Sequence, residues 1–149
     1  AIFAGGTGLF DPVFVDVFVW ADDSEGHPGA VLCARVNVNV PEPPVLPGVQ
    51  RLDVSMDGCC VEGSWWVGFW NRSVVDGGAI FVWADLNGPN LGTPMTKVPP
   101  GLQWPEGWQD VDVVWGEGVH SLGIGAVLEP CEPVAVETAP WGSLKGSFR

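Results

Sequence analysis

Two histidines, His27 and His120, are the side chains of this sequence best suited to acid–base catalysis. Neither lies in a nucleophile motif, and the sequence contains no G-x-S-x-G pattern. The 18 Asp and Glu residues could supply a carboxylate pair for glycoside cleavage, but no spacing singles out two of them. We therefore predict that both histidines lie in loops and that the protein is not an enzyme.

Two polar loops, each entered through an aspartate, could hold calcium. They follow Asp22 and Asp85 and contain the carboxylate and amide oxygens that Ca²⁺ prefers. Neither loop has EF-hand spacing, so we favour the simpler role in which Asp and Asn bond the local backbone of a turn. The alternative is a structural calcium ion held by Asp22, Asp23, Asp85 and Asn87. No other metal and no cofactor is predicted.

The nine tryptophans suggest a different chemistry, the stacking of indole rings on sugars. In a carbohydrate-binding module, exposed indoles carry the ligand while nearby Asp, Asn and Gln side chains bind its hydroxyl groups. The candidates for this role are Trp66, Trp70, Trp104 and Trp108. Trp20 and Trp83 occupy equivalent places in a repeated motif and are expected in the core.

Four cysteines without C-x-x-C spacing fit disulfide bonds better than a zinc site. Adjacent residues on a strand point to opposite faces, and a bond between Cys59 and Cys60 would be strained. We therefore expect each of them to bond elsewhere, to Cys33 and Cys131 in an order that the sequence leaves open. One bridge would then fix the C-terminal segment. Disulfides indicate a protein outside the reducing cytosol, and a chain that begins at Ala1 is expected of a secreted protein after signal-peptide removal.

Composition points to an all-β protein that binds neither nucleic acid nor a membrane interior. The net charge is −12 with only six Lys and Arg, whereas nucleic acid and anionic membranes need cationic partners. No apolar run is long enough to span a bilayer. Alternating Val and Phe at residues 13–20, and alternating Val at 35–40, predict strands, and the 21 Gly and 14 Pro residues supply turns.

The stretch FVWAD occurs twice, at residues 18–22 and 81–85, and two further blocks repeat in the same order. Gln50 to Val54 parallels Gln109 to Val113, and Val67-Gly68-Phe69 parallels Leu122-Gly123-Ile124. This predicts an internal duplication, about residues 13–70 and 76–127, with four strands in each half. We therefore predict a jelly-roll-like antiparallel β-sandwich of about eight strands at residues 1–130, followed by a C-terminal tail at 131–149.

Several motifs resemble an uncharacterised all-β domain of bacterial secreted proteins. They are D-x-x-x-G-x-P-G at residues 22–29, the Trp65 to Phe69 stretch, Pro105 to Gln109 and Leu122 to Gly125. The tail, residues 141–149, is similar to a W-G-x-[LI]-K-x-x-[FY]-R ending of the same kinds of chain. The resemblance implies secretion, with a bacterial cell surface as the location, and a β-fold; it implies no activity.

Charged residues make up only 16% of the chain and the mean hydropathy is +0.22, so we expect apolar surface to contact another chain. The predicted function is a non-enzymatic structural subunit of an extracellular filament or surface layer, whose partners are copies of itself joined through terminal or edge strands. The assembly candidates are Ile2, Phe3, Leu9, Phe10, Trp141, Leu144 and Phe148. The alternative is a carbohydrate-binding module with an extracellular glycan as partner.

Overall fold

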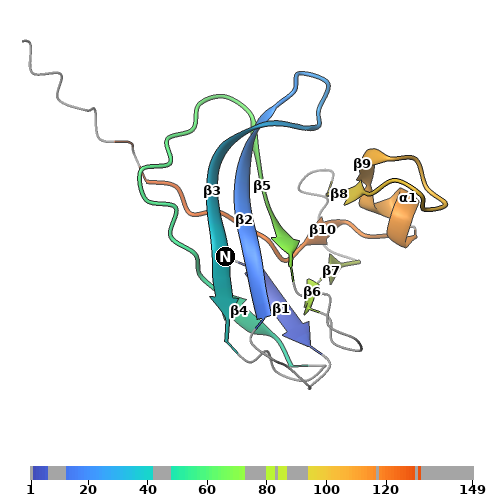
Figure 1. Ribbon diagram of the computed structural model, residues 1–149, viewed down its shortest axis with the longest axis horizontal. Coiled ribbons are helices and arrows are strands. Elements are labelled where there is room, and N and C mark those ends of the chain that lie inside the picture. The colour runs from blue at the N-terminus through green and yellow to red at the C-terminus, as the bar shows by residue number, and fades with distance from the viewer. Residues whose placement is uncertain are drawn as a thin grey trace, which may run out of the picture.

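The computed structural model describes residues 2–6, 13–41, 48–72, 80–82, 84–86, 94–116, 118–129 and 131. Ten strands and one short helix lie in this part of the chain (Figure 1). In chain order these are β1 (Ile2–Gly6), β2 (Val13–Asp22), β3 (Pro28–Val40), β4 (Gln50–Leu52), β5 (Trp65–Asn71), β6 (Ile80–Val82), β7 (Ala84–Asp85), β8 (Met95–Val98), β9 (Gly107–Asp110), α1 (Val111–Trp115) and β10 (Ser121–Leu122). Every strand pair is antiparallel, which confirms the predicted all-β class.

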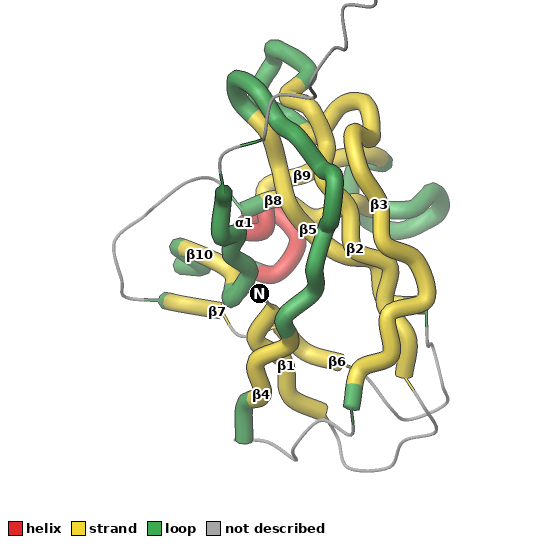
Figure 2. Tube along the Cα trace, turned by 90° about the vertical axis from the view of Figure 1, so that its left-hand side faces the viewer, coloured by secondary structure: helices red, strands yellow, loops and turns green. Residues whose placement is uncertain are grey.

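The strands form two sheets of three strands, in the orders β3-β2-β5 and β4-β1-β6, and two pairs, β10-β7 and β8-β9. The β3-β2-β5 sheet is the largest of these sheets, because β2 is ten residues long, mostly apolar, and pairs with a long strand on each side. The β4-β1-β6 sheet lies at one end of the large sheet (Figure 2).

The two larger sheets pack on one another through an aliphatic core. Its buried members are Ile2, Val15, Val17 and Val40, against which Leu52, Phe69 and Val82 pack. Since these residues come from all six strands, the two sheets share one core. We call the side of the large sheet that carries Val15, Val17 and Val19 the core face.

Strand β3 is irregular, and the irregularity lies opposite Asp16. The register between β2 and β3 shifts at three places, the first between Val15 and Val17. At that bulge Asn37 has a φ of 55°, a left-handed conformation that Asn tolerates better than most residues. The bulge presents the Asn37 backbone N–H to strand β2, where it meets a carboxylate described below.

The second half of the chain departs from the predicted repeat. Val111 to Val113, expected in a strand, lie in α1, because a helical turn places Val111 and Val114 on one side, where Val111 is fully buried. The second FVWAD stretch is divided between β6 and β7, and Trp83 lies outside the described residues. The strand count is also ten rather than about eight in the described part of the chain.

The N-terminal strand is already paired on both sides within its own chain. Strand β1 is the centre of the β4-β1-β6 sheet, and Ile2 is only 4% exposed and also bridges to Ile124. Ile2 is therefore a core residue within its own chain, and its predicted role in assembly stays a prediction. The Phe3 side chain and residues Leu9, Phe10, Trp141, Leu144 and Phe148 lie outside the described residues.

Candidate functional site

The side of the β3-β2-β5 sheet opposite the core face is rich in aromatic residues. Strand register places three residue pairs directly opposite one another on it: Trp20 with Trp66, Phe18 with Gly68 and Asp16 with Trp70. Phe14 continues the same row on β2, next to Arg72 just beyond the end of β5. We call this surface, made of Phe14, Asp16, Phe18, Trp20, Trp66, Gly68, Trp70 and Arg72, the aromatic face.

At one end of the aromatic face, three rings pack together. Phe18 stacks on Trp20 with ring centroids 5.3 Å apart, and Trp108 of β9 meets Trp20 edge-on at 5.5 Å. A Cβ atom at Gly68 would lie 3.1 Å from the Trp20 ring, so glycine at this position leaves room for the indole. Trp20 is half-buried and belongs to this cluster instead of the aliphatic core in which it was predicted.

Two further contacts hold this end in place. Trp66 donates its indole N–H to Asp22 Oδ2 at 3.0 Å, and the other oxygen of Asp22 accepts the Ser24 backbone N–H at 2.8 Å. The Lys97 ammonium lies 5.7 Å from the centroid of the Trp108 ring, within the range of a cation–π contact. The indoles at this end are therefore half-buried and held in fixed orientations.

The other end of the aromatic face is built on a buried carboxylate. Asp16 is only 5% exposed, and its Oδ1 accepts the Asn37 backbone N–H at 2.8 Å. Arg72 approaches Asp16 Oδ2 to 2.8 Å with its Nε and donates from Nη1 to the Asn37 side-chain oxygen at 2.9 Å. The guanidinium of Arg72 thus ties β5 to β2 and to the bulge of β3, which satisfies the buried charge.

Trp70 is the most exposed indole of the aromatic face. It is 50% exposed and lies opposite Asp16, two residues from Arg72 on the same side of its strand. Of the four tryptophans predicted to bind glycan, the structure places Trp66 and Trp70 on the aromatic face and Trp108 against it. Trp104 is half-buried in the loop that precedes β9.

The loop after Asp22 has the local backbone bonding that was favoured over calcium binding. Asp23 Oδ1 accepts the backbone N–H groups of Glu25 and His27 at 2.8 and 2.9 Å, and the His27 hydrogen bond is the main reason that the pKa of Asp23 is lowered. The Asp23, Glu25 and His27 ligand atoms lie within 4.8 Å of one another, but all of these groups serve or border the turn. The Asp85 side chain and Asn87 lie outside the described residues.

The histidines lie outside regular structure, as expected of loop residues. His27 Nδ1 lies 3.4 Å from the Asp23 carboxylate at the tip of the β2–β3 hairpin, whereas His120 precedes β10. His120 also has an interaction of its own. Neither histidine is on the aromatic face.

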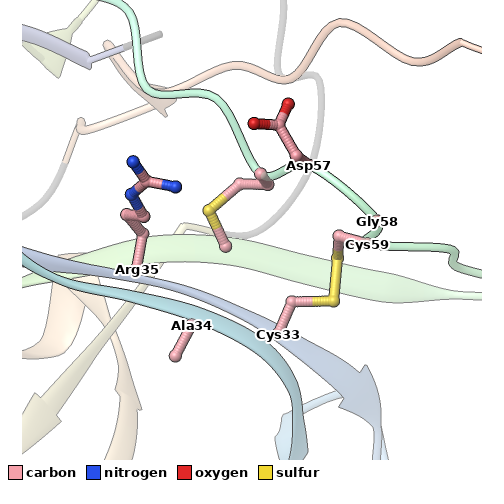
Figure 3. Close-up of a pocket in the computed structure, with 7 residues that line it drawn as sticks. Cys33, Ala34, Arg35, Asp57, Gly58 and Cys59 are labelled. Carbon is pink, nitrogen blue, oxygen red and sulfur yellow. A yellow bond between two sulfur atoms is a disulfide. The ribbon is translucent and has the colours of Figure 1, made fainter.

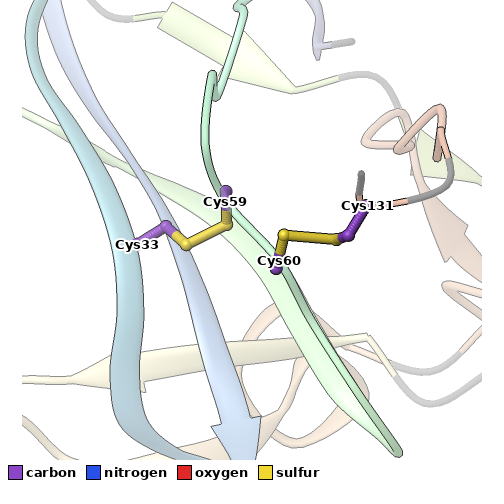
Figure 4. The surroundings of a disulfide bond; sticks show 4 residues. All are labelled: Cys33, Cys59, Cys60 and Cys131. Carbon is purple, nitrogen blue, oxygen red and sulfur yellow. A yellow bond between two sulfur atoms is a disulfide. The ribbon is translucent and has the colours of Figure 1, made fainter. Parts of the chain in front are cut away.

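Two disulfides, formed by the adjacent Cys59 and Cys60, join the loop before β5 to strand β3 and to the C-terminal segment. Cys33 of β3 pairs with Cys59, and Cys60 pairs with Cys131, each with Cα atoms 5.9 Å apart. Cys59 and Cys60 point to opposite sides, toward β3 and toward the C-terminal segment respectively (Figure 4). The bonding order left open by the sequence is thus resolved, and the start of the C-terminal tail is fixed to the loop before β5.

The hollow beside the first disulfide is too small for a typical ligand site. It lies between β3 and the loop that contains Met56, Asp57 and Gly58, with a volume of about 240 Å³ (Figure 3). Pockets for small molecules usually measure about 300–1,000 Å³. The aromatic face is therefore the stronger candidate.

Comparison with protein-family models, curated protein sequences and solved structures finds no match to this chain. The resemblance of its motifs to a bacterial secreted domain stays a prediction.

Sequence reasoning missed the polar end of the aromatic face. Asp16, Asn37 and Arg72 are far apart in the chain, and the strand register that unites them cannot be derived from spacing. One signal was present: Asp16 interrupts an otherwise apolar alternating strand, and a charge in such a position calls for a buried partner.

Proposed function

We propose that this protein is a non-enzymatic extracellular binding module that holds glycans on its aromatic face. The observation that carries the proposal is the alignment of Trp66 and Trp70 on one side of β5, with exposed Trp70 beside an ion pair. Indole rings stack on the apolar C–H faces of sugar rings, and neighbouring polar groups bind the hydroxyls.

The overall charge favours a glycan over an anionic polymer or a second copy of the chain. The formal net charge of −12 adds a repulsive contribution between two copies, which salt screens beyond about a Debye length, roughly 8 Å at physiological ionic strength. An uncharged glycan meets no such repulsion. This supports the choice of a glycan as ligand.

The proposal includes an extracellular location for the protein. Two disulfides are compatible with an extracellular protein, and none of the helices in the described part of the chain has the length and apolarity needed to cross a membrane. We infer a secreted module at a bacterial cell surface, where glycans are abundant.

The test is retention on insoluble glycans. The purified protein is incubated with cellulose and with chitin, and the bound fraction is compared for the wild type, Trp70→Ala and Trp115→Ala. Trp115 is a matched control because its exposed fraction, 52%, is similar to that of Trp70, but it lies on α1. We expect the affinity of Trp70→Ala to be about tenfold weaker, equivalent to about 1.4 kcal/mol, and that of the control to equal the wild type. Equal retention of both variants would exclude the aromatic face.

We propose, as a second candidate function, the self-assembly predicted from composition, with an edge strand of the large sheet as the contact. Strand β3 borders the large sheet, and Val31, Leu32 and Val36 on it are exposed. An apolar edge can pair with the same edge of another copy, although the bulges of β3 oppose this. Sedimentation velocity of the wild type and Val36→Lys checks it: assembly through β3 predicts oligomers only for the wild type.

The duplication and the jelly-roll arrangement are also proposals. They draw limited support from one shared neighbourhood: β5, which contains Val67-Gly68-Phe69, pairs with β2, and β10, which contains Leu122, pairs with β7, although the register of the two pairs differs. The partners of β3 and β8 differ, since β3 pairs with β2 but β8 pairs with β9.

A further inference from the structure

We propose that Arg72 is the polar recognition residue of the aromatic face, and that Asp16 and Asn37 restrict the ligand to an uncharged pyranose glycan. This inference rests on the proposed glycan-binding function and names the class of glycan. It depends on three features of the described residues: the orientation of Arg72, its remaining donors, and the cancellation of its charge.

The orientation of Arg72 is set before any ligand arrives. Its Nε and Nη1 atoms are fixed by Asp16 Oδ2 at 2.8 Å and by Asn37 Oδ1 at 2.9 Å. Asp16 is itself 5% exposed and accepts the Asn37 backbone N–H, so the anchor is rigid. A donor that is already ordered loses little conformational entropy when it binds, which raises affinity.

Arg72 keeps donors that can reach a sugar. Its side chain is 53% exposed, and within the described residues its bonds to Asp16 and Asn37 use two of its five N–H groups. Trp70 lies next to it on the same side of β5, with its indole half exposed. A pyranose ring stacked on Trp70 would bring its hydroxyl or acetamido oxygens within reach of these N–H groups.

The charge of the site selects an uncharged ligand. The Asp16 carboxylate balances the Arg72 guanidinium, so this end of the face has no excess positive charge, and the chain as a whole carries −12. A uronic acid polymer would gain no net attraction at Arg72 and would be repelled by the protein. Cellulose and chitin share the expected chemistry, uncharged pyranose rings with apolar faces.

The experiment measures retention of the full chain on cellulose, chitin and polygalacturonate. The variants are Arg72→Gln, Asp16→Asn and, as a matched control, Arg51→Gln. Arg51 is 54% exposed and forms an ion pair with Asp53, but it lies on β4. Thermal melting followed by tryptophan emission reports the folded fraction, to which all retention is normalised.

We expect the wild type to bind cellulose or chitin and to leave polygalacturonate in solution. Arg72→Gln should weaken binding to the uncharged glycan about tenfold, while Arg51→Gln leaves it unchanged. Asp16→Asn keeps an acceptor for Asn37 but frees the Arg72 charge, so it should raise retention on polygalacturonate several-fold, with the gain lost in high salt. A merely structural role for Asp16 would not change which glycan is bound.

Two results would overturn the inference in distinguishable ways. If Trp70→Ala abolishes binding while Arg72→Gln behaves like Arg51→Gln, the proposed function stands and the role of Arg72 is wrong. If the wild type is retained on no glycan, both the function and the inference are wrong. Should Asp16→Asn fail to fold, Asn37→Gly replaces it, because glycine suits the φ of 55° while removing the acceptor of Nη1. Unchanged affinity in that variant would also contradict the inference.

Discussion

The two faces of the β3-β2-β5 sheet use alternate residues of the same strand for different purposes. Val15, Val17 and Val19 of β2 are buried on the core face, whereas Phe14, Phe18 and Trp20 lie on the aromatic face with part of their surface exposed. The small valines pack against a second sheet. The large rings pack against one another and leave Trp70 open to solvent. From this comparison we expect stability to come mainly from the core face, and the proposed glycan binding to depend on the aromatic face.

The largest expected effect comes from the disulfide on the core face. Replacing both Cys33 and Cys59 by Ala opens a loop with a sequence separation of 26 residues, which should lower the free energy of unfolding by about 3–4 kcal/mol. Chemical denaturation of the double variant measures the change. A loss below about 1 kcal/mol would show that the bridge adds little to the core face.

The second-largest loss of stability is expected from a cavity created at Val15. Val15 is 1% exposed, so Val15→Ala removes two buried methyl groups and should cost about 2 kcal/mol. Glycan binding by the folded fraction should stay unchanged, because Val15 points away from the aromatic face. A variant as stable as the wild type, or one that folds but no longer binds, would break the division between the faces.

A smaller effect is expected at Trp66 on the aromatic face. Trp66→Phe removes the 3.0 Å hydrogen bond to Asp22 and should lower stability by about 1 kcal/mol. Trp115→Phe serves as the control, because Trp115 lies on α1. If Trp66→Phe costs as much as Val15→Ala, the aromatic face contributes to stability as much as the core face does.

The smallest expected effect is on the pH dependence of stability, through Asp23 at the tip of the β2–β3 hairpin. The pKa of Asp23 is lowered mainly by the hydrogen bond from the His27 backbone, so its charged form is favoured in the folded state. Its contribution to stability is present above the ordinary Asp pKa and is lost as the pH falls through the lowered folded value. Asp23→Asn should therefore flatten this part of the stability curve, measured by thermal melting between neutral and acidic pH. An unchanged curve would contradict the contribution of this turn.

The sequence predicted much of the first half of the fold. Alternation at residues 13–20 and 35–40 correctly placed β2 and β3, because an amphipathic strand repeats every two residues. The adjacent cysteines also predicted that Cys59 and Cys60 bond to different partners. These signals are local, and local signals are the ones that a single sequence carries.

The remaining features could not be predicted because they depend on contacts between residues far apart in the chain. Residues 111–113 alternate apolar and polar as in a strand, yet they form a helical turn in which Val111 is buried. The repeated motif predicts Trp20 in the core, whereas its edge-on contact with Trp108 depends on the position of β9, which is distant in the sequence. The Arg72–Asp16 pair depends equally on strand pairing, so no motif could reveal it.

The most direct test of glycan binding on the aromatic face is a titration followed by nuclear magnetic resonance. Each tryptophan side chain gives an indole N–H signal, and soluble hexasaccharides of cellulose or chitin are added to the labelled protein. We predict that the Trp70 signal, assigned with Trp70→Phe, shifts in a saturable manner while the Trp115 signal does not. If the Trp70 signal stays in place at saturating oligosaccharide, or Trp115 shifts instead, the account is contradicted.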